Sequence, residues 1–328
     1  MSDSNTQKST KVTFVEIDEG YAGQRIDNFL LRELKGVPKS RIYRILRKGE
    51  VRVNKARIKP EYKLCTGDTV RIPPVRMAAD KPPQQVSESL GTLLNSAILY
   101  EDSELMIVNK PSGLAVHGGS GINQGLIEAL RVLRPDCRHL ELVHRLDRDT
   151  SGCIMVAKKR SMLRFLHAHL REGGIDKRYL ALAAGRWPNR RRVVNAPLEK
   201  NTLQSGERMV RVAVEGKRSV TEFDIVQRYE QATLVEAKPI TGRTHQIRVH
   251  ALHVGNPLLG DDKYGDTLAC KQFRDKGLSR LFLHAKSLTV PMPDERPALR
   301  VEAPLSLELT LLLERLKPVS GESENRGD

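Results

Sequence analysis

Four short apolar runs most constrain what this chain can fold into. Turn-forming residues bound each of them: LMIVN at 105–109, CIMVA at 153–157, YLALAA at 179–184 and TLVEA at 233–237. Runs of this length and with these boundaries are typical of strands. Helical patterns occur in the same part of the chain, at 124–133, 161–172, 244–253 and 305–316, but they do not alternate regularly with the strands. We therefore expect an α+β fold with a mainly antiparallel sheet rather than a doubly wound parallel sheet.

Positive charge is concentrated near the N-terminus. The 328 residues include 55 Lys and Arg against 40 Asp and Glu, a net charge of +15. Residues 25–76 hold 15 Lys and Arg and 5 Asp and Glu, so a surplus of +10 lies within 52 residues. A surplus of this kind favours a polyanionic partner, such as nucleic acid or an anionic membrane. The alternative is a basic enzyme whose charge serves solubility alone.

The basic segment has the pattern of a small α+β unit. Apolar residues mark two helical faces, separated by GVPKS, and short strand-like pieces follow Gly49. The basic side chains gather around the second helix and the next strand: Lys39, Arg41, Arg44, Arg47, Lys48 and Arg52. Arg41, Arg44 and Lys48 are spaced to share one helix face. Such a stripe suits a phosphate backbone, although a solvated charged face is the commoner arrangement.

Composition divides the chain into five parts. We expect a flexible tail at 1–20, the small basic domain at 21–76, a proline-containing linker at 77–96, the larger domain at 97–317 and a disordered tail at 318–328. Total length agrees with two domains of ordinary size.

The compartment follows from cysteine usage and hydropathy. Cys65, Cys137, Cys153 and Cys270 form no CxxC motif and no dense disulfide framework. The first ten residues contain no apolar stretch typical of a signal peptide. No apolar run approaches the roughly 18 to 20 residues of a membrane span. We expect a soluble, cytoplasmic protein that contacts no membrane.

The densest polar cluster is HRLDRDTSG at 144–152, between two strand-like segments. Basic residues that alternate with two carboxylates, followed by Thr-Ser-Gly, are typical of a functional loop on a sheet scaffold. A surface turn with salt bridges would have the same sequence.

A second cluster, TGRTHQIR at 241–248, follows a strand and opens a helix. Helix starts favour anions, so Arg243 beside this start could hold a carboxylate in its ionised form. A structural ion pair would look identical in sequence. Tyr179, in the Lys-Arg-Tyr cluster at 177–179, is a third candidate, although its phenol could simply pack.

Other chemistries have weaker support. Asp147 and Asp149 are two residues apart and could bind a divalent ion as nucleases require. His245, His250 and His253 lack the HExxH spacing of a zinc site. The glycine-rich stretch at 118–125 lacks both the GK[ST] ending and the GxGxxG order, so we expect no nucleotide cofactor.

Four blocks together resemble the pseudouridine synthases that modify ribosomal RNA, in the branch with an HRLD motif. The blocks are HRLDRDTSG, KRYLALAAG, ITGRTHQIRVH and LLGDDKYG, in this order. The basic segment is similar to the small RNA-binding domain first recognised in a small-subunit ribosomal protein, which precedes the catalytic domain in many members. The similarity covers nearly all of residues 12–316.

The resemblance implies a reaction that needs no cofactor and no metal. Enzymes of this family break the bond between uracil and ribose, turn the ring and rejoin it through carbon. Asp147 would be the catalytic carboxylate, acting either as nucleophile or as base, and Arg243 would pair with it. Tyr179 would stack on the target base and help to remove the proton from the ring carbon.

A paired uridine must be flipped out of its helix to reach such a site, at a cost of a few kcal/mol. By resemblance, Arg145 with His144 beside it would hold the flipped state, and Leu283 would close over the ring. Asn256-Pro257 stands where many relatives have His-Pro, a departure that concerns loop packing. The implied partner is large-subunit ribosomal RNA, modified at several uridines. For the oligomeric state, a monomer is the default expectation. The rival interpretation is a non-catalytic RNA-binding protein.

Overall fold

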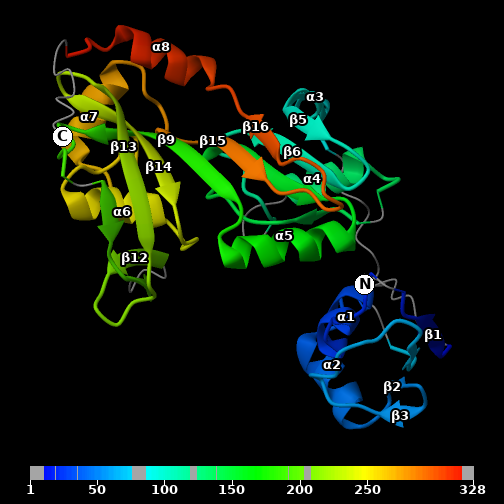
Figure 1. Ribbon diagram of the computed structural model, residues 1–328. Helices are drawn as coiled ribbons and strands as arrows, with labels where there is room; N and C mark the ends of the chain where they lie inside the picture. The colour runs from blue at the N-terminus through cyan, green and yellow to red at the C-terminus, as the bar shows by residue number, and fades with distance from the viewer. Residues whose placement is uncertain are drawn as a thin grey trace, which may run out of the picture. The chain divides into compact units, whose positions relative to one another are not determined.

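The computed structural model describes residues 11–18, 20–34, 36–75, 86–118, 124–137, 139–190, 192–202 and 208–319. The chain forms two compact units, Met1–Gln85 and Val86–Asp328 (Figure 1). In its described parts, no helix is both long enough and apolar enough to cross a membrane.

The first unit is a four-stranded antiparallel sheet with two helices. Its elements are β1 (Thr13–Glu16), α1 (Ile26–Glu33), α2 (Lys39–Arg47), β2 (Arg52–Val53), β3 (Ala56–Arg57) and β4 (Thr69–Ile72), with strand order β1-β4-β2-β3. The two predicted helical faces form its core, because Phe29, Leu30, Ile42 and Ile45 are fully buried. The α+β prediction for this segment is therefore confirmed.

The expected boundaries at either end of this unit need correction. Strand β1 lies inside the predicted tail 1–20 and pairs with β4 from Thr13–Ile72 to Glu16–Thr69. Ile17, which follows it, is buried in the core at 1% exposure. Part of the predicted linker 77–96 is helix α3 (Glu88–Ser96), whose start is capped by the Ser87 hydroxyl. At the C-terminal end of the chain, the predicted tail 318–328 starts two residues too early, because Pro318 forms a β-bridge with Tyr229 and the Val319 N–H donates to the Arg228 carbonyl at 3.0 Å. Residues 1–10, 76–85 and 320–328 lie outside the described residues, so for them the tail and linker remain predictions.

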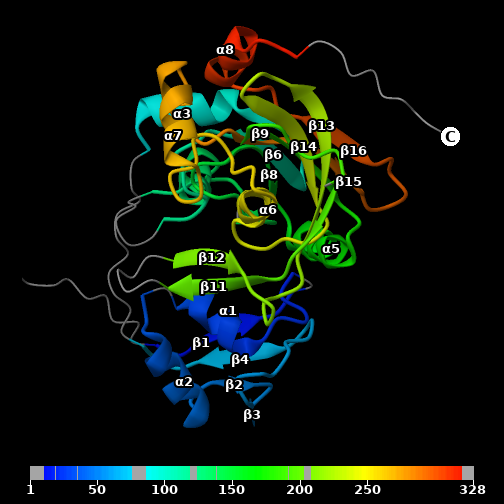
Figure 2. The same ribbon diagram turned by 90° about the vertical axis from the view of Figure 1, so that its left-hand side faces the viewer.

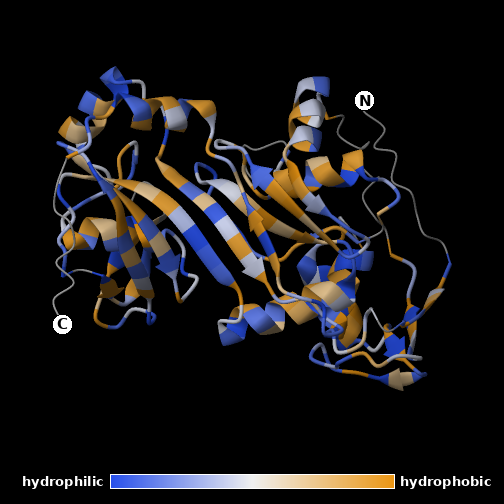
Figure 3. Cartoon of the chain, turned by 45° about the horizontal axis from the view of Figure 1, so that its top comes forward, coloured by the Kyte–Doolittle hydropathy of each residue, from blue (hydrophilic) through white to orange (hydrophobic). Residues whose placement is uncertain are grey.

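The second unit is built on a ten-stranded sheet in the order β10-β13-β14-β9-β15-β8-β6-β5, with β16 on β15 and β7 on β8. Its strands are β5 (Ile98–Glu101), β6 (Leu105–Lys110), β7 (Glu141–Leu142), β8 (Ser151–Ala157), β9 (Asp176–Ala184), β10 (Val193–Asn195), β13 (Val220–Arg228), β14 (Ala232–Pro239), β15 (Leu283–Val290) and β16 (Leu299–Glu302). The four predicted apolar runs are β6, β8, β9 and β14, and all four lie inside the sheet. Figure 3 shows apolar residues following the strands of this sheet.

One pair of strands divides this sheet. Between β8 and β15 the strands run parallel, paired only at Ser151–His284 and Gly152–Ala285, whereas the other pairings of the described sheets are antiparallel. Gly152 is required here: its φ is 106°, and a Cβ would collide with the carbonyl group of Ala285. The mainly antiparallel sheet is confirmed, and this parallel seam makes it mixed.

The helices of the second unit complete the fold. Besides α3 they are α4 (Leu126–Leu133), α5 (Arg160–Glu172), α6 (Gln246–Val254), α7 (Thr267–Asp275) and α8 (Leu307–Arg315). A separate hairpin of β11 (Leu198–Thr202) and β12 (Arg208–Val212) lies apart from the large sheet (Figure 2). It packs against α6 through a small cluster of Leu198, Val210, Val249 and Tyr264.

Candidate active site

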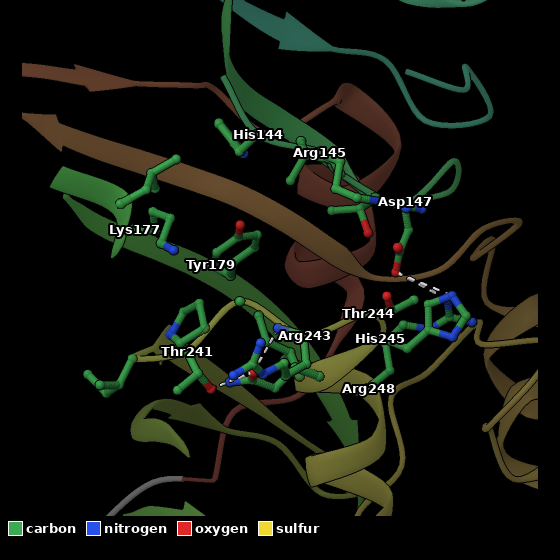
Figure 4. A pocket seen from close by; sticks show the side chains of 18 of the residues that line it. His144, Arg145, Asp147, Lys177, Tyr179, Thr241, Arg243, Thr244, His245 and Arg248 are labelled. Atoms are coloured by element: carbon green, nitrogen blue, oxygen red, sulfur yellow. Dashed lines mark hydrogen bonds and ion pairs between the residues drawn. The ribbon is translucent and has the colours of Figure 1, made fainter. Parts of the chain in front are cut away.

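A cavity of about 640 Å³ opens where the ends of β8, β9 and β15 meet the start of α6. It contains every residue that the sequence analysis assigned to catalysis or base flipping: His144, Arg145, Asp147, Tyr179, Arg243 and Leu283. The loop before β8 supplies the first three, and Figure 4 shows Asp147 facing the residues that precede and open α6. The predicted convergence of the separate sequence blocks is thus present in the structure.

The cation beside Asp147 is not the predicted one. Arg248 Nη1 lies 3.4 Å from Asp147 Oδ2, whereas the Arg243 side chain is exposed and its Nε donates to the Arg218 carbonyl at 3.2 Å. The reason is local geometry, since α6 begins at Gln246 and places Arg248 in its first turn, facing inward. The expected Arg243–Asp147 pair is therefore wrong for this structure, although Arg243 still lines the cavity.

Arg248 is itself held by a second carboxylate. Its Nε and Nη2 each donate to Asp261 at 2.7 Å, and both side chains are almost fully buried. Burial disfavours the Arg248 charge, but the hydrogen bonds and the charge of Asp261, together with the charge of Asp147, outweigh burial, so the pKa of Arg248 is raised. Asp261 also accepts the backbone N–H groups of Lys263 and Tyr264. The LLGDDKYG block, whose residues had no assigned role, thus fixes the cation that faces Asp147.

Gln246 holds the loop that leads into α6. Its side-chain oxygen accepts from the Thr241 hydroxyl at 2.7 Å and from the Arg243 backbone N–H at 3.0 Å. Its amide nitrogen donates to the Val220 carbonyl and the Thr221 hydroxyl, both at 2.9 Å. One buried amide therefore joins this loop to β13, a role that residue type alone does not reveal.

Tyr179 stands on β9 with its ring against the cavity (Figure 4). Its side chain is 9% exposed. Burial, followed by the charge of Asp147, raises the pKa of its phenol well above the usual range. The phenol therefore keeps its proton at neutral pH.

His144 fastens the HRLD loop to β8. The Met155 backbone N–H donates to His144 Nε2 at 3.1 Å, so the neutral ring carries its proton on Nδ1. Burial, with a smaller contribution from Lys177, lowers the pKa of His144 to about 3. Its neighbour Arg145 is exposed at the cavity, and Leu283 is 4% exposed. The structure thus gives His144 an anchoring contact and leaves Arg145 accessible.

Lys110, which the sequence analysis missed, supports the same loop from within. Its side chain is fully buried, and Nζ donates to the carbonyls of Pro111, Leu114 and Arg148 at 2.8 to 2.9 Å. Burial, with a smaller contribution from Arg280, lowers the pKa of Lys110 to about 7. The Ser112 hydroxyl adds a bond to the Asp149 carbonyl at 2.8 Å. The last residue of β6 and the segment that follows it therefore hold the backbone that carries Asp147.

The predicted RNA-contacting residues lie on the first unit. All six are on or near α2: Lys39, Arg44, Arg47, Lys48 and Arg52 are exposed and Arg41 is half-buried. Arg52 is partly engaged, because its guanidinium donates to the carbonyls of Gly49 and Lys55.

Asp149 does not join Asp147 in a metal-type cluster. Its carboxylate accepts from Arg148 at 3.1 Å, and within the described residues no three or more His, Cys, Asp or Glu side chains gather as a metal site would require.

The fold and the cavity define the class of protein. Residues 104–253 match the family model described as RNA pseudouridylate synthase, and residues 24–70 match the S4 domain. The chain belongs to the pseudouridine synthase family and is an isomerase with an N-terminal S4 RNA-binding domain.

The most similar curated proteins that were compared carry one name. The chain is 58% identical to "Ribosomal large subunit pseudouridine synthase C" of Pasteurella multocida, over 93% of this chain and 94% of that protein. The protein of the same name from Escherichia coli is 57% identical, over 94% and 97%. Among solved structures, human RNA pseudouridylate synthase domain containing 4 aligns with a TM-score of 0.58 at 28% identity, over 70% of this chain and 97% of that one. Human RNA pseudouridylate synthase domain containing 1 aligns with a TM-score of 0.56 at 26% identity, over 68% of this chain and 88% of that one.

Proposed function

We propose that this protein converts several specific uridines of large-subunit ribosomal RNA to pseudouridine, with Asp147 as the catalytic carboxylate. The observation that carries the proposal is the position of Asp147, which faces a buried, doubly anchored arginine across a cavity that also holds Tyr179. The large-subunit substrate is taken from relatives that share 57 to 58% of their residues with this chain along nearly its whole length.

Asp147 is positioned rather than loosely exposed. Arg248 lies 3.4 Å from its Oδ2, and this cation cannot swing away because Asp261 holds it by two hydrogen bonds. On the buried side of the loop, Lys110 donates a hydrogen bond to the carbonyl of Arg148, the residue that follows Asp147 in the chain. A carboxylate held from two sides can attack, or take a proton from, the same atom of each substrate.

Tyr179 suits one of its two expected roles better than the other. A phenol that keeps its proton is a poor base, so its raised pKa favours stacking on the uracil ring over removing a proton from the ring carbon. The ring lies beside the cavity, where a flipped base would enter. Leu283, also at the cavity, is the apolar residue that would close over the base.

Arg145 is the residue proposed to fill the space left by the flipped base. Its side chain is exposed, and the neighbouring His144 is bonded to β8, which holds the backbone from which Arg145 projects. A guanidinium can stack on bases and bond their edges, so it can replace the interactions that the uridine gives up.

Docking is assigned to the first unit. Four of its six basic residues belong to α2, Lys48 follows that helix and Arg52 lies on β2. Phosphate contacts of this kind provide affinity with little sequence information. We infer a monomer acting in the cytoplasm without a cofactor.

Arg243 is proposed as a further contact to the substrate. Its guanidinium is exposed at the cavity, and among the bonds described above it meets only the backbone carbonyl of Arg218.

The experiment that tests this function is a map of pseudouridine in large-subunit RNA from cells with and without the gene. We expect several sites to lose the modification when the gene is absent and to regain it with the wild-type gene. Unchanged sites would contradict the proposal and favour the rival, a non-catalytic RNA-binding protein.

The catalytic assignment has its own test. Asp147→Asn should abolish isomerisation of a ribosomal RNA fragment while RNA affinity changes by less than about tenfold, because affinity comes mainly from phosphate contacts. Asp149→Asn is the matched control, since it removes a carboxylate two residues away that pairs with Arg148 at the surface. Loss of RNA binding in Asp147→Asn would show instead that Asp147 is structural.

A further inference from the structure

His245 occupies an unusual position beside the catalytic carboxylate. It is the last residue before α6 and has a left-handed backbone with φ of 55°, which is uncommon outside glycine. Its Nε2 lies 3.8 Å from Asp147 Oδ2, and its Nδ1 lies 2.8 Å from the Tyr264 hydroxyl oxygen. The backbone strain therefore places one imidazole between a carboxylate and a phenol.

A third group, the Val210 backbone N–H, decides the direction of the hydrogen bond between His245 and the Tyr264 phenol. The Val210 backbone N–H donates to the Tyr264 oxygen at 2.9 Å, in a buried contact. Since that oxygen already accepts a hydrogen bond, its own proton is available to His245 Nδ1. The neutral imidazole must then carry its proton on Nε2, which is the nitrogen that faces Asp147.

Burial is the main reason that the imidazole is neutral. Burial lowers the pKa of His245, and the cations Arg248 and Lys263 lower it further, whereas the nearby carboxylate of Asp147 and that of Asp261 raise it. An imidazolium would also donate from Nδ1, so the Tyr264 oxygen would have to accept both this bond and the one from Val210. A neutral ring satisfies all these groups at once.

We propose that His245 is a positioning residue that presents an Nε2–H donor to Asp147, in a tautomer fixed by Tyr264. The inference rests on the proposed function of Asp147. The present separation of 3.8 Å exceeds a hydrogen bond, and a closure of roughly 1 Å would complete it. His245 then orients the same carboxylate oxygen that Arg248 approaches, from a different direction.

The β11–β12 hairpin sets this arrangement. Val210 belongs to β12, and the hairpin reaches α6 through the cluster that contains Tyr264. Moving β12 away would remove the N–H donor that directs the Tyr264 proton to His245.

The tautomer can be measured without turnover. We expect ¹⁵N chemical shifts of the histidine rings in the full-length protein to show, for His245, an unprotonated Nδ1 and a protonated Nε2 at pH 7. The signal is assigned by its loss in His245→Asn. Tyr264→Phe, which keeps the ring but removes the hydroxyl, should change the tautomer. A wild-type ring that is charged, or protonated on Nδ1, would overturn the inference.

Turnover tests the consequence for Asp147. His245→Asn tolerates the left-handed backbone and retains an amide near the Nδ1 position, but it has no group at Nε2. We expect saturated turnover to fall about tenfold or more, as for loss of a hydrogen bond to a charged group, with RNA affinity unchanged. His253→Asn, at an exposed position of α6, is the control.

Wild-type saturated turnover in His245→Asn would overturn the inference. If wild-type protein made no pseudouridine in ribosomal RNA, the proposed function would fail, while the tautomer measurement would still decide the hydrogen-bond direction. Failure of this inference and failure of the proposed function are therefore distinguishable.

Discussion

Two arginines in one sequence block have different surroundings, and these differences predict different effects on stability. Arg248→Met should lower the free energy of unfolding by about 3 to 5 kcal/mol, because it leaves the Asp261 carboxylate buried without a cation. Arg243→Met should change it by less than about 0.5 kcal/mol, because that guanidinium is exposed. Urea unfolding of both variants measures the difference, and equal losses would contradict the ion pair described here.

His144 makes stability depend on pH. Its folded pKa of about 3 lies below the ordinary 6.5, so the unfolded chain binds the proton more readily between these values. Stability is therefore lost as pH falls from about 6.5 toward about 3, by about 2 kcal/mol between pH 7 and pH 5.

His144→Gln removes this titration and can still accept the Met155 N–H through its side-chain oxygen. We expect the variant to lose about 2 kcal/mol less stability than wild type over that pH interval in urea unfolding. His253→Gln, at an exposed position, serves as the control. A wild-type pH dependence in His144→Gln would show that the ring is not buried in its neutral form.

At the residue scale, the sequence predicts which side chains gather but not which pairs form. Asp147, Tyr179 and Arg243 were correctly placed at one cavity, because the loop and helix-start motifs are local signals. The partner of Asp147 was missed because Arg243 and Arg248 are five residues apart, and the exact start of α6 decides which of them faces inward. Asp261 and Tyr264 act from a distant segment, and no local pattern links them to the site.

At the scale of elements, the end of β6 and the segment after it hold the Asp147 loop. Ser112→Ala removes the hydrogen bond to the Asp149 carbonyl, and we expect saturated turnover to fall roughly two- to tenfold. Ser96→Ala is the matched control, because it removes a hydrogen bond from the Ser96 hydroxyl to the Leu93 carbonyl at the end of α3. Turnover equal to that of the control would show that the clamp does not influence the carboxylate.

Strands with long apolar runs were predictable because the local sequence already shows that they are buried. In β8, for example, all seven residues are buried. Strand β1 was not, because its four residues are mostly exposed and it forms by pairing with β4, more than fifty residues later. Helix α3 was assigned to the linker because prolines before it dominate the composition of that segment. Its amphipathic face packs through Leu94 into the core of the second unit.

At the scale of the whole molecule, docking and chemistry are expected to separate. Replacing Arg44 and Arg47 with Gln should weaken RNA binding and reduce the slope of log affinity against log salt, by about 0.7 to 0.9 for each phosphate that is no longer neutralised. Turnover at saturating RNA should be largely intact. Arg300→Gln, which removes an exposed arginine of the second unit, is the control.

Binding measured across a salt series, together with turnover at saturation, tests this separation. A collapse of saturated turnover in the Arg44 and Arg47 variant would mean that the first unit also takes part in the chemical step. The sequence alone predicted this division from the distribution of charge, because charge is counted along the chain and needs no tertiary information.

The parallel seam between β8 and β15 has a mechanical consequence. Only two register pairs join the strands there, the fewest between neighbouring strands in the main order of the described sheet. Parallel pairing is also slightly less stable per residue than antiparallel pairing. Asp147 belongs to the side that carries β8, whereas Tyr179, His245 and Arg248 belong to the side that carries β9 and α6. We therefore expect that a small tilt of one half of the sheet against the other would change the distance between Asp147 and Arg248 without unfolding any strand.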